Sequence, residues 1–453
     1  MGPSQSTTRC EEKLPPARKP LLPQSCFAIS WVRLASNREL RVKPVSCDME
    51  NTYEPPDTSI ELFTGAGGLA LGVARAGYRH AAVVEWNRDA CESLRLNSLR
   101  VPEMADWPVF EADVTEFNFT PYRGLIRLLA AGAPCQPFSL GGKHKGDSDA
   151  RNMFPQVFRA VRELAPDIVI IENVKGLLRQ SFRPYFDYIK RQLAAPERSC
   201  PRTRDWREHD SKLVSIGGAR HLGELTYHVD HQLLNAADFG VPQTRQRVFI
   251  VAFRSDLGVR WRPIAATHSE DALLHSKWVE DSYWREHGRK RPDTPDSLRQ
   301  RISRLEVLGG ALFEKRWRTV RDALKGLPEP KDRKESPRIL NHVGNPGARS
   351  YPGHTGSLYD APAKTLKAGD HGVPGGENML RRDDGSVRYF SVREAARLQC
   401  FPDAYEFAGA WSEGFRQLGN AVPVLLAQAV VEHATRLLNA ASTTHSRVRE
   451  RVA

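Results

Sequence analysis

The sequence predicts an α/β fold with a mostly parallel sheet, joined to a second, smaller and loop-rich domain. Two observations predict the sheet. Short apolar runs alternate with stretches of helical spacing, and the runs are apolar throughout, which is typical of strands covered on both faces. A third observation predicts the second domain. Between residues 255 and 385 the alternation stops, and residues 341–377 are dense in Gly, Pro, Asn and His.

The individual elements follow from local patterns. Apolar side chains recur at helical spacing over residues 153–164, which predicts a helix there. Ser391 and Glu394 have the spacing of a capping box and should begin another helix. An apolar helix over residues 423–438 is long enough to pack back on the sheet. Strands are expected at residues 59–63, 80–84, 109–113, 125–131, 167–171, 227–234 and 247–253.

These patterns divide the chain into five parts. Residues 1–58 are rich in Pro, Ser and Arg without a sustained period, and we expect a disordered leader. The main domain should comprise residues 59–254 and, after the smaller domain at 255–385, a return segment at 386–440. Residues 441–453 are expected to be a flexible tail.

Composition narrows the class of protein. The 453 residues include 66 Lys or Arg and 54 Asp or Glu, and the resulting net charge of +12 suits a polyanionic partner. Seven scattered cysteines without a C-x-x-C pair argue against a disulfide framework and a cysteine zinc site, and we predict no metal. No run approaches the roughly 18 apolar residues that a membrane span needs. The expectation is a soluble, cytoplasmic protein.

Polar residues follow the first three strands. The glycine loop at 65–68 lets the backbone approach a ligand closely, Glu85 and Trp86 follow the second strand, and Asp113 follows the third. An acid at the position of Glu85 can bond ribose hydroxyls, Trp86 can stack on adenine, and Asp113 can accept from an exocyclic amine. Together they favour an adenosine-bearing cofactor without a pyrophosphate. The alternative is an ordinary turn with solvated acids.

Three further motifs could carry chemistry. Cys135 stands between two prolines at the fourth strand end and is either a reactive thiol or a buried small hydrophobe. Glu172, with Asn173, is either a cap or a group held for ligand bonding. Gln243, Arg245 and Arg247 alternate, so they share one face of an extended segment. That face is either an exposed basic edge or a donor fork aimed at a carbonyl or phosphate.

Taken together, six motifs in order resemble those of the C5-cytosine DNA methyltransferase family over residues 59–254 and 386–432. Any one of them is weak, but six at compatible spacings are very specific. The sequence departs from the family's pattern in Glu61, where Asp is commoner, and in an insertion at about residues 196–222. The motifs are Glu61-Leu-Phe-Thr-Gly-Ala-Gly-Gly68, Pro134-Cys-Gln-Pro-Phe-Ser139, Glu172-Asn-Val174, Gln243-x-Arg-x-Arg247, Arg393-Glu-Ala-Ala-Arg-Leu398 and Gly419-Asn-Ala-Val422.

The resemblance implies a Rossmann-like S-adenosylmethionine-dependent methyltransferase domain, with a target-recognition domain at 255–385. It makes Cys135 the nucleophile, has Glu172 and Arg245 hold the target cytosine, and gives Arg247 a supporting contact. The residues implied to bind S-adenosylmethionine are Phe63, Gly65, Gly67, Glu85, Trp86, Asp113, Asn420 and Val422. Further contacts to substrate or DNA are implied for Gln136, Ser139, Asn173, Gln243 and Arg247.

The family's chemistry explains these residue types. C5 of cytosine is a poor nucleophile until the Cys135 thiolate adds to C6 and makes the ring an enamine. After C5 has accepted the methyl group, loss of its proton expels the thiolate. Glu172 would bond N3 and the exocyclic amine, and donating to N3 requires a protonated carboxyl and hence a raised pKa. A stacked base is out of reach, so the cytosine must be flipped out.

Other readings remain open. A tRNA cytosine-5 methyltransferase of the same architecture is the nearest, although the roughly 130 residues at 255–385 favour double-stranded DNA. Methylation of an exocyclic amine would require an Asp-Pro-Pro-Tyr type loop, which is absent. A DNA-binding relative without activity would have lost Cys135 or Glu172, and a nicotinamide-dependent oxidoreductase leaves both unexplained.

The resemblance also implies a biological setting. We expect a monomeric bacterial enzyme of the restriction–modification type, associated with the nucleoid through DNA and paired with an endonuclease that acts on the same site. Groove contacts are expected within residues 342–376, with Thr365, Lys367 and Asp370 as the best candidates.

Overall fold

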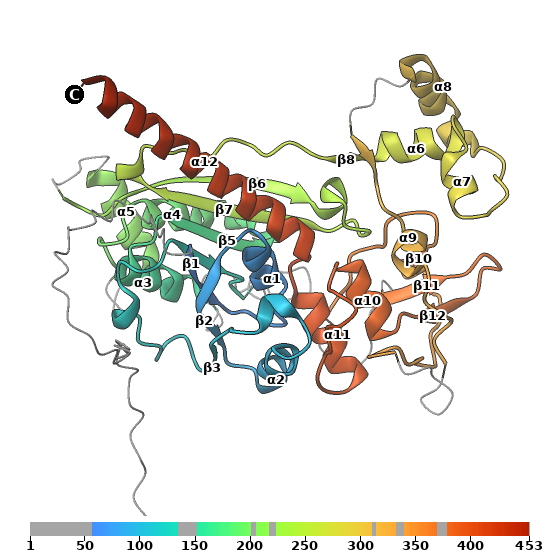
Figure 1. Ribbon diagram of the computed structural model, residues 1–453, viewed down its shortest axis with the longest axis horizontal. Helices are drawn as coiled ribbons and strands as arrows, with labels where there is room; N and C mark the ends of the chain where they lie inside the picture. The colour runs from blue at the N-terminus through green and yellow to red at the C-terminus, as the bar shows by residue number, and fades with distance from the viewer. Residues whose placement is uncertain are drawn as a thin grey trace, which may run out of the picture. The chain divides into compact units, whose positions relative to one another are not determined.

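The main domain of the computed structural model is built on a seven-stranded sheet (Figure 1). The structure describes residues 57–134, 152–200, 205–216, 223–309, 314–331, 339–368 and 378–452. The strand order is β3-β2-β1-β4-β5-β7-β6. The first five strands of this order run parallel, whereas β7 is antiparallel to both of its neighbours. The mostly parallel α/β fold is therefore confirmed.

All seven expected strands are present. Their bounds are β1 Thr58–Leu62, β2 Arg79–Glu85, β3 Val109–Glu111, β4 Leu128–Ala131, β5 Ile168–Val174, β6 Tyr227–Asn235 and β7 Gln246–Arg254. Because β1 to β5 are parallel, their carboxyl ends lie at one edge of the sheet. Ligands in open α/β sheets bind beyond that edge.

Helices cover both faces of the sheet, as the apolar strand runs predict. On one face, α3 (Phe154–Leu164) and α4 (Arg183–Ala194) pack on alternate side chains of the strands. On the other face, α1 (Gly68–Arg75) and α12 (Val424–Val452) pack on the intervening side chains. The two helices of the second face touch closely, since a Cβ added to Gly72 would lie 2.4 Å from Cβ of Ala427.

The capping box and the last helix are also confirmed. The Ser391 hydroxyl accepts from the Glu394 N–H, and the Glu394 carboxylate accepts from the Ser391 N–H, which begins α10 (Val392–Leu398). α12 begins at Val424 and continues past residue 440, so the segment expected to be a flexible tail is helical up to Val452. Helix α11 (Trp411–Asn420) precedes it.

The insertion after β5 contains α5 (Trp206–Ile216), which packs on α4. Arg191 of α4 donates to both carboxylate oxygens of Asp210 at 2.6 and 2.7 Å, and the buried Tyr188 hydroxyl lies 3.1 Å from Nδ1 of His209. These contacts make α5 part of the helical layer that α3 and α4 form.

Helix α2 (Arg88–Asn97) follows β2 on the opposite face of the sheet, where its Leu94 joins an apolar cluster with Val83 of β2 and Leu71 of α1.

The segment predicted to recognise the target contains two small units. A helical lobe has its own apolar cluster, in which Trp278, Tyr283 and Trp284 are the large members. A three-stranded sheet lies beside it, and since β12 pairs with β11, this sheet extends past the predicted boundary at residue 385. The elements are β8 His268–Ser269, α6 Glu270–Trp278, α7 Ser282–Glu286, α8 Arg299–Leu308, β9 Lys315–Arg316, α9 Val320–Leu324, β10 Ser357–Leu358, β11 Met379–Arg381 and β12 Val387–Tyr389.

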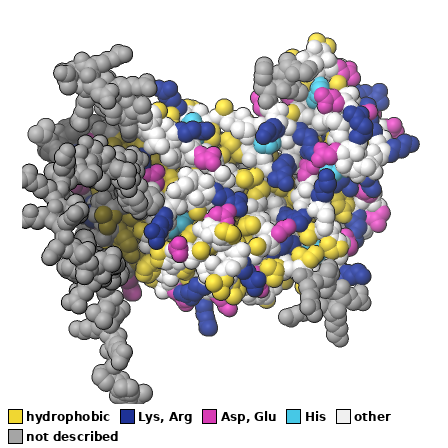
Figure 2. All heavy atoms as spheres, in the orientation of Figure 1, with side chains coloured by type: hydrophobic (Ala, Val, Ile, Leu, Met, Phe, Trp, Pro, Cys, Tyr) yellow, Lys and Arg dark blue, Asp and Glu magenta, His cyan; other side chains and the backbone are white. Residues whose placement is uncertain are grey.

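One stretch in the described chain, residues 411–441, is long and apolar enough by composition to cross a membrane. It consists of α11 and most of α12, separated by residues 421–423. More than half of its most apolar window, 56%, is buried inside the structure, where α12 packs on α1. Its apolar character is therefore that of a core helix. On the surface, Lys and Arg side chains are interspersed with acidic ones over the face drawn in Figure 2.

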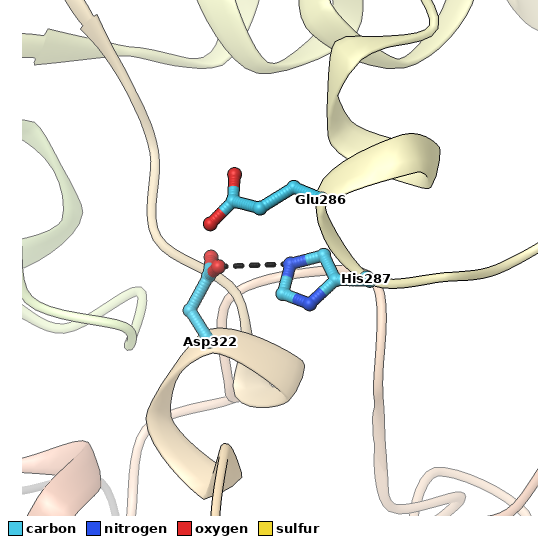
Figure 3. Close-up of side chains that lie close together, drawn as sticks. All are labelled: Glu286, His287 and Asp322. Carbon is cyan, nitrogen blue, oxygen red and sulfur yellow. Dashed lines mark hydrogen bonds and ion pairs between the residues drawn. The ribbon is translucent and has the colours of Figure 1, made fainter.

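A polar cluster joins the helical lobe to α9 (Figure 3). Glu286, His287 and Asp322 point toward one another, with ligand atoms close enough for a cation. Arg316 already supplies the positive charge, because its guanidinium donates to both oxygens of Asp322 and to Glu286. Asp322 also accepts from the backbone N–H of Thr319 and closes the capping box of α9. The cluster is therefore a structural junction.

Asp322→Ala should destabilise this junction by about 2 kcal/mol, since it removes a buried ion pair and a helix cap. Although burial acts in the opposite direction, Arg316 and the Thr319 N–H lower the pKa of Asp322 to about 2. A depressed pKa adds stability above the unfolded value of 3.8, and this contribution disappears as the pH falls through 2. The difference between wild type and variant, measured by urea unfolding, should therefore shrink between pH 4 and pH 2.

The exposed pair Asp296–Arg299 provides the control. Its side chains are 89% and 71% exposed, so Asp296→Asn should change the free energy of unfolding by a few tenths of a kcal/mol at most. An Asp322→Ala variant as stable as the control at neutral pH would contradict the structural role of the cluster.

Candidate functional site

A cavity of about 570 Å³ opens at the carboxyl ends of the parallel strands. Ligand sites for small molecules are typically about 300–1,000 Å³, so a nucleoside-sized molecule fits. Segments from both ends of the described chain line it, because the loop after β1 and residues 419–422 meet there. The lining residues are Glu61, Phe63, Thr64, Gly65, Leu69, Val84, Glu85, Trp86, Asn87, Ala90, Ala112, Asp113, Val114, Gly132, Ala133, Pro134, Met153, Glu172, Val174, Arg247, Arg416, Gln417, Gly419, Asn420, Ala421 and Val422.

The loop after β1 is held in an unusual backbone conformation. Phe63 and Gly65 have φ of 57° and 55°, a left-handed region that L-residues rarely adopt, and both line the cavity. Gly67, with φ of 76°, is the N-cap of α1 and lies outside the cavity lining. A Cβ on Gly68 would lie 2.2 Å from the carbonyl oxygen of Val422, so only glycine allows these two segments to approach so closely.

Glu85 is fixed before any ligand arrives. Its carboxylate accepts from the backbone N–H groups of Gly65, Asn87 and Trp86 at 2.7, 2.8 and 3.1 Å. Burial raises the pKa of Glu85, while these N–H groups lower it. The neighbouring Trp86 is 77% exposed at the cavity wall, so its indole is open to a ligand there. Asp113 stands exposed at the same wall.

Glu61 is a second buried acid in the cavity lining, and the sequence analysis noted it only as a departure from the commoner Asp. It is 1% exposed, and among the described residues no group meets the geometry of a hydrogen bond to either carboxylate oxygen, although the N–H of Ala70 lies near. Burial raises its pKa well above the usual value, and the backbone N–H of Ala70 in α1 offsets only part of this. A carboxylate within an otherwise apolar strand was the available signal.

Glu172 and Arg247 form the other half of the cavity. In the β5–β7 register Val174 pairs with Arg247, which places the arginine beside the carboxylate. Arg247 Nε lies 2.7 Å from Glu172 Oε1, and both side chains are about nine-tenths buried. Burial raises the pKa of Glu172, and the charges of Arg247 and Arg245 counteract it. The expectation of a raised pKa is confirmed in direction.

The structure describes only the first residue of the nucleophile motif, Pro134. Cys135, Gln136 and Ser139 lie outside the described residues, whereas Pro134 and Ala133 line the cavity. Asn173, expected to contact substrate, is buried and absent from the lining. Its amide donates to the Ala133 carbonyl at 3.1 Å, and its oxygen accepts from the Val174 N–H. Its contacts thus fix the segment that leads to Cys135.

The Gln-x-Arg-x-Arg motif is arranged differently from the expectation. Gln243 and Arg245 are fully buried and do not line the cavity, whereas Arg247 does. Arg245 donates to the carbonyl oxygens of Leu366, Gly419 and Ala421 at 2.9, 2.7 and 2.9 Å. The structure therefore exchanges the positions expected for the two arginines: Arg247 stands at the site and Arg245 supports the wall behind it.

The segment expected to make groove contacts is not accessible at its first residue. His342 is fully buried and lies 2.8 Å from both the Ser391 hydroxyl and the Pro328 carbonyl oxygen, so it cannot reach DNA. Thr365 donates to the carbonyl of Thr244, and Lys367 is exposed. Asp370 lies outside the described residues.

Arg416 is a further lining residue that the sequence analysis did not single out. It lies on α11 and donates to both oxygens of Glu413 at 2.7 and 2.6 Å. Its charge also lowers the pKa of Glu85, which places it on the Glu85 side of the cavity. The position four residues before Asn420 was the only signal available in the sequence.

Comparisons with known proteins agree with this geometry. The sequence model of the C-5 cytosine-specific DNA methylase family matches residues 58–196 and 207–436. Type II methyltransferase M.Eco47II from Escherichia coli is 31% identical over 84% of this chain and 79% of its own length. Type II methyltransferase M.NgoMIV from Neisseria gonorrhoeae is 31% identical over 82% of this chain and 95% of its own length.

The fold is similar to that of a solved protein. A prophage-encoded Escherichia coli protein, described as a DNA modification methyltransferase, aligns with a TM-score of 0.50 and 22% identity. The alignment covers 84% of this chain and 99% of the other.

Proposed function

Since this chain belongs to the C-5 cytosine-specific DNA methylase family, we propose that its cavity holds S-adenosylmethionine and that Cys135, Glu172 and Arg247 act on the target base. The enzyme is a DNA methyltransferase that modifies cytosine at C5. One observation carries the proposal. The part of the cavity that suits a nucleoside, around the fixed Glu85 carboxylate, and the buried Glu172–Arg247 pair line the same cavity.

The residues of the cavity fit the cofactor. Glu85 would accept from the ribose hydroxyls and Trp86 would stack on the adenine, while Asp113 would accept from its exocyclic amine. The Glu61 carboxylate, which accepts no well-formed hydrogen bond among the described residues, would accept from the α-ammonium group. When bound, S-adenosylmethionine supplies an electrophilic methyl group.

The protein's own contribution is to make cytosine reactive. The Cys135 thiolate would add to C6, which shifts electron density toward C5 and N3. A protonated Glu172 would donate to N3 as charge builds there, and its raised pKa keeps that form available. Arg247 would hold the Glu172 carboxyl and the O2 oxygen of the base. Loss of the C5 proton then releases the thiolate.

Arg247→Lys tests the revised role of this residue. Lysine keeps the charge but lacks the planar donor fork that contacts two groups at once, so methyl transfer in a single turnover should slow by about 10²-fold. Cofactor affinity should stay within about threefold, because Arg247 lies at the Glu172 end of the cavity. A variant with the wild-type single-turnover rate would contradict a contact between Arg247 and the base.

A covalent adduct with fluorinated DNA tests the proposed reaction. Fluorine at C5 blocks loss of a proton, so duplex DNA with 5-fluorocytosine at the target should trap the Cys135–C6 thioether. Mass spectrometry should show a complex of one chain and one strand only with wild-type protein and cofactor. A matched 5-fluorocytosine tRNA forms the second arm, and trapping on tRNA alone would overturn DNA as the substrate.

The relatives also indicate a biological setting. Type II methyltransferases are the relatives reported above, and we infer that this enzyme protects host DNA as a cytoplasmic monomer alongside an endonuclease with the same target. Bisulfite sequencing of DNA from a methylation-free host that expresses the protein would identify the target sequence. Unmodified DNA in that host, despite soluble protein, would contradict this inference.

A further inference from the structure

Arg245 joins two segments that are far apart in the sequence. Its side chain is fully buried, and its guanidinium donates to the carbonyl oxygen of Leu366 on one side and to those of Gly419 and Ala421 on the other. Gly419 and Ala421 flank Asn420 and line the cofactor cavity. Leu366 belongs to the segment expected to recognise the target. The Arg245 side chain is therefore hydrogen-bonded both to the recognition segment and to the cavity wall.

The preceding residues of the motif fasten the same segment. The Gln243 side chain accepts from the Leu366 N–H at 3.1 Å and donates to the Leu398 carbonyl at 3.3 Å. The backbone N–H of Thr244 donates to the Ala363 carbonyl at 2.8 Å. Residues 363 and 366 are therefore hydrogen-bonded to residues 243–245, which lead into β7.

The cavity wall also touches this segment directly. A Cβ on Gly419 would lie 2.2 Å from the backbone nitrogen of Ala368, so glycine is needed for the approach. On its other side the wall contacts α1, since a Cβ on Gly68 would meet the Val422 carbonyl oxygen. Residues 419–422 are held between the recognition segment and the glycine loop of the cofactor site.

The helical lobe is bonded to the same segment through Asp360. The Asp360 carboxylate accepts two hydrogen bonds from Arg321, at 2.6 and 3.0 Å, and one from the Tyr283 hydroxyl at 2.7 Å. Lys277 Nζ donates to the Asp360 carbonyl at 2.7 Å. A displacement of the lobe on binding DNA would therefore be transmitted along residues 360–368 to Arg245.

We propose that Arg245 is a positioning residue that couples DNA binding by the recognition domain to cofactor binding. This rests on the proposed function, because it requires the cavity to hold the cofactor. The carbonyls of residues 366, 419 and 421 share one rigid donor, so a shift of the recognition segment must displace the wall around Asn420 or break these bonds. Coupling of this kind is reciprocal: each ligand tightens the other by the same factor.

The test is the affinity for S-adenosylhomocysteine with and without duplex DNA that contains the target found by bisulfite sequencing. In wild type, DNA should tighten binding by about tenfold, within the usual range for coupled sites. In Arg245→Met the factor by which DNA tightens S-adenosylhomocysteine binding should fall below about twofold. Arg245→Lys, which keeps the charge and can satisfy part of the carbonyl set, should fold and give an intermediate factor.

Arg393→Met is the matched control. Arg393 is also fully buried and also donates to three backbone carbonyls, those of Leu340, Pro402 and Tyr405, but it does not line the cavity. Its loss should lower stability by a similar amount and leave the coupling factor at the wild-type value. A similar loss of coupling in Arg393→Met would reduce the effect to general destabilisation and overturn the proposal.

The remaining outcomes are distinguishable. Wild type that does not bind S-adenosylhomocysteine refutes the proposed function, and the coupling with it. Wild type that binds it without any effect of DNA, or Arg245 variants with full coupling, refutes the coupling alone. With saturating cofactor, Arg245→Lys should trap 5-fluorocytosine DNA within about threefold of the wild-type rate. If Arg245→Lys trapped this DNA more slowly than Arg247→Lys does, Arg245 would have to contact the base, as the sequence analysis expected.

Discussion

The Cys135→Ser variant should bind S-adenosylhomocysteine as tightly as wild type and lose methyl transfer by a factor on the order of 10⁴ or more. A serine hydroxyl is a weak nucleophile without an adjacent base, whereas a thiol is partly ionised near neutral pH. Pro134, the residue before Cys135 in the sequence, lines the cavity. Calorimetry and transfer of labelled methyl groups measure the two properties.

A control separates this loss from the general effect of removing a thiol. Cys200 is half-buried and outside the cavity lining, and Cys200→Ser should keep full turnover. Methyl transfer by Cys135→Ser at a rate close to that of the Cys200 variant would show that the reaction does not proceed through a thioether at Cys135.

Glu172→Gln should lower the rate of adduct formation by about 10³-fold, within the range for a positioned acid or base. The amide oxygen of glutamine can still accept from Arg247 Nε, so the geometry of the pair should persist while the proton for N3 is lost. Because burial raises the pKa of Glu172, the wild-type rate should decline as the pH rises through that pKa. Rapid-quench kinetics with 5-fluorocytosine DNA, from acid to neutral pH, would measure both effects, and the variant should lack the decline.

Another buried Glu–Arg pair serves as the comparison. Glu394 is 1% exposed and accepts from both Nη groups of Arg388 at 2.7 Å, away from the cavity. Glu394→Gln should reduce stability but leave the rate per folded molecule unchanged. If Glu172→Gln also kept its rate, Glu172 would be a structural cap for the end of β5.

Local patterns were sufficient for the sheet and for much of the site. Apolar runs specify buried parallel strands, and the same edge then collects Glu85, Asp113 and Glu172 because each lies at or near the carboxyl end of a strand. The capping box at Ser391 is equally local, since both of its hydrogen bonds join residues three apart. Chemistry confined to one element or one strand end could therefore be predicted.

Contacts between distant segments could not be predicted in this way. Alternation places Arg245 and Arg247 on one face of an extended segment, yet Arg245 precedes β7 and meets residues more than 120 positions away. The β5–β7 register, which decides that Arg247 meets Glu172, is a tertiary property. His342 shows the converse, since a polar residue in a Gly- and Pro-rich stretch is buried by partners from two other segments.

The packing of α12 on α1 has a consequence for biosynthesis. Residues 63–423 separate the end of β1 from the beginning of α12, and at about 5–20 residues per second a ribosome needs roughly 20–70 s to make them. During that time the face of the sheet that α12 covers would stay open to water. The nascent chain would then depend on chaperones until its last helix has emerged.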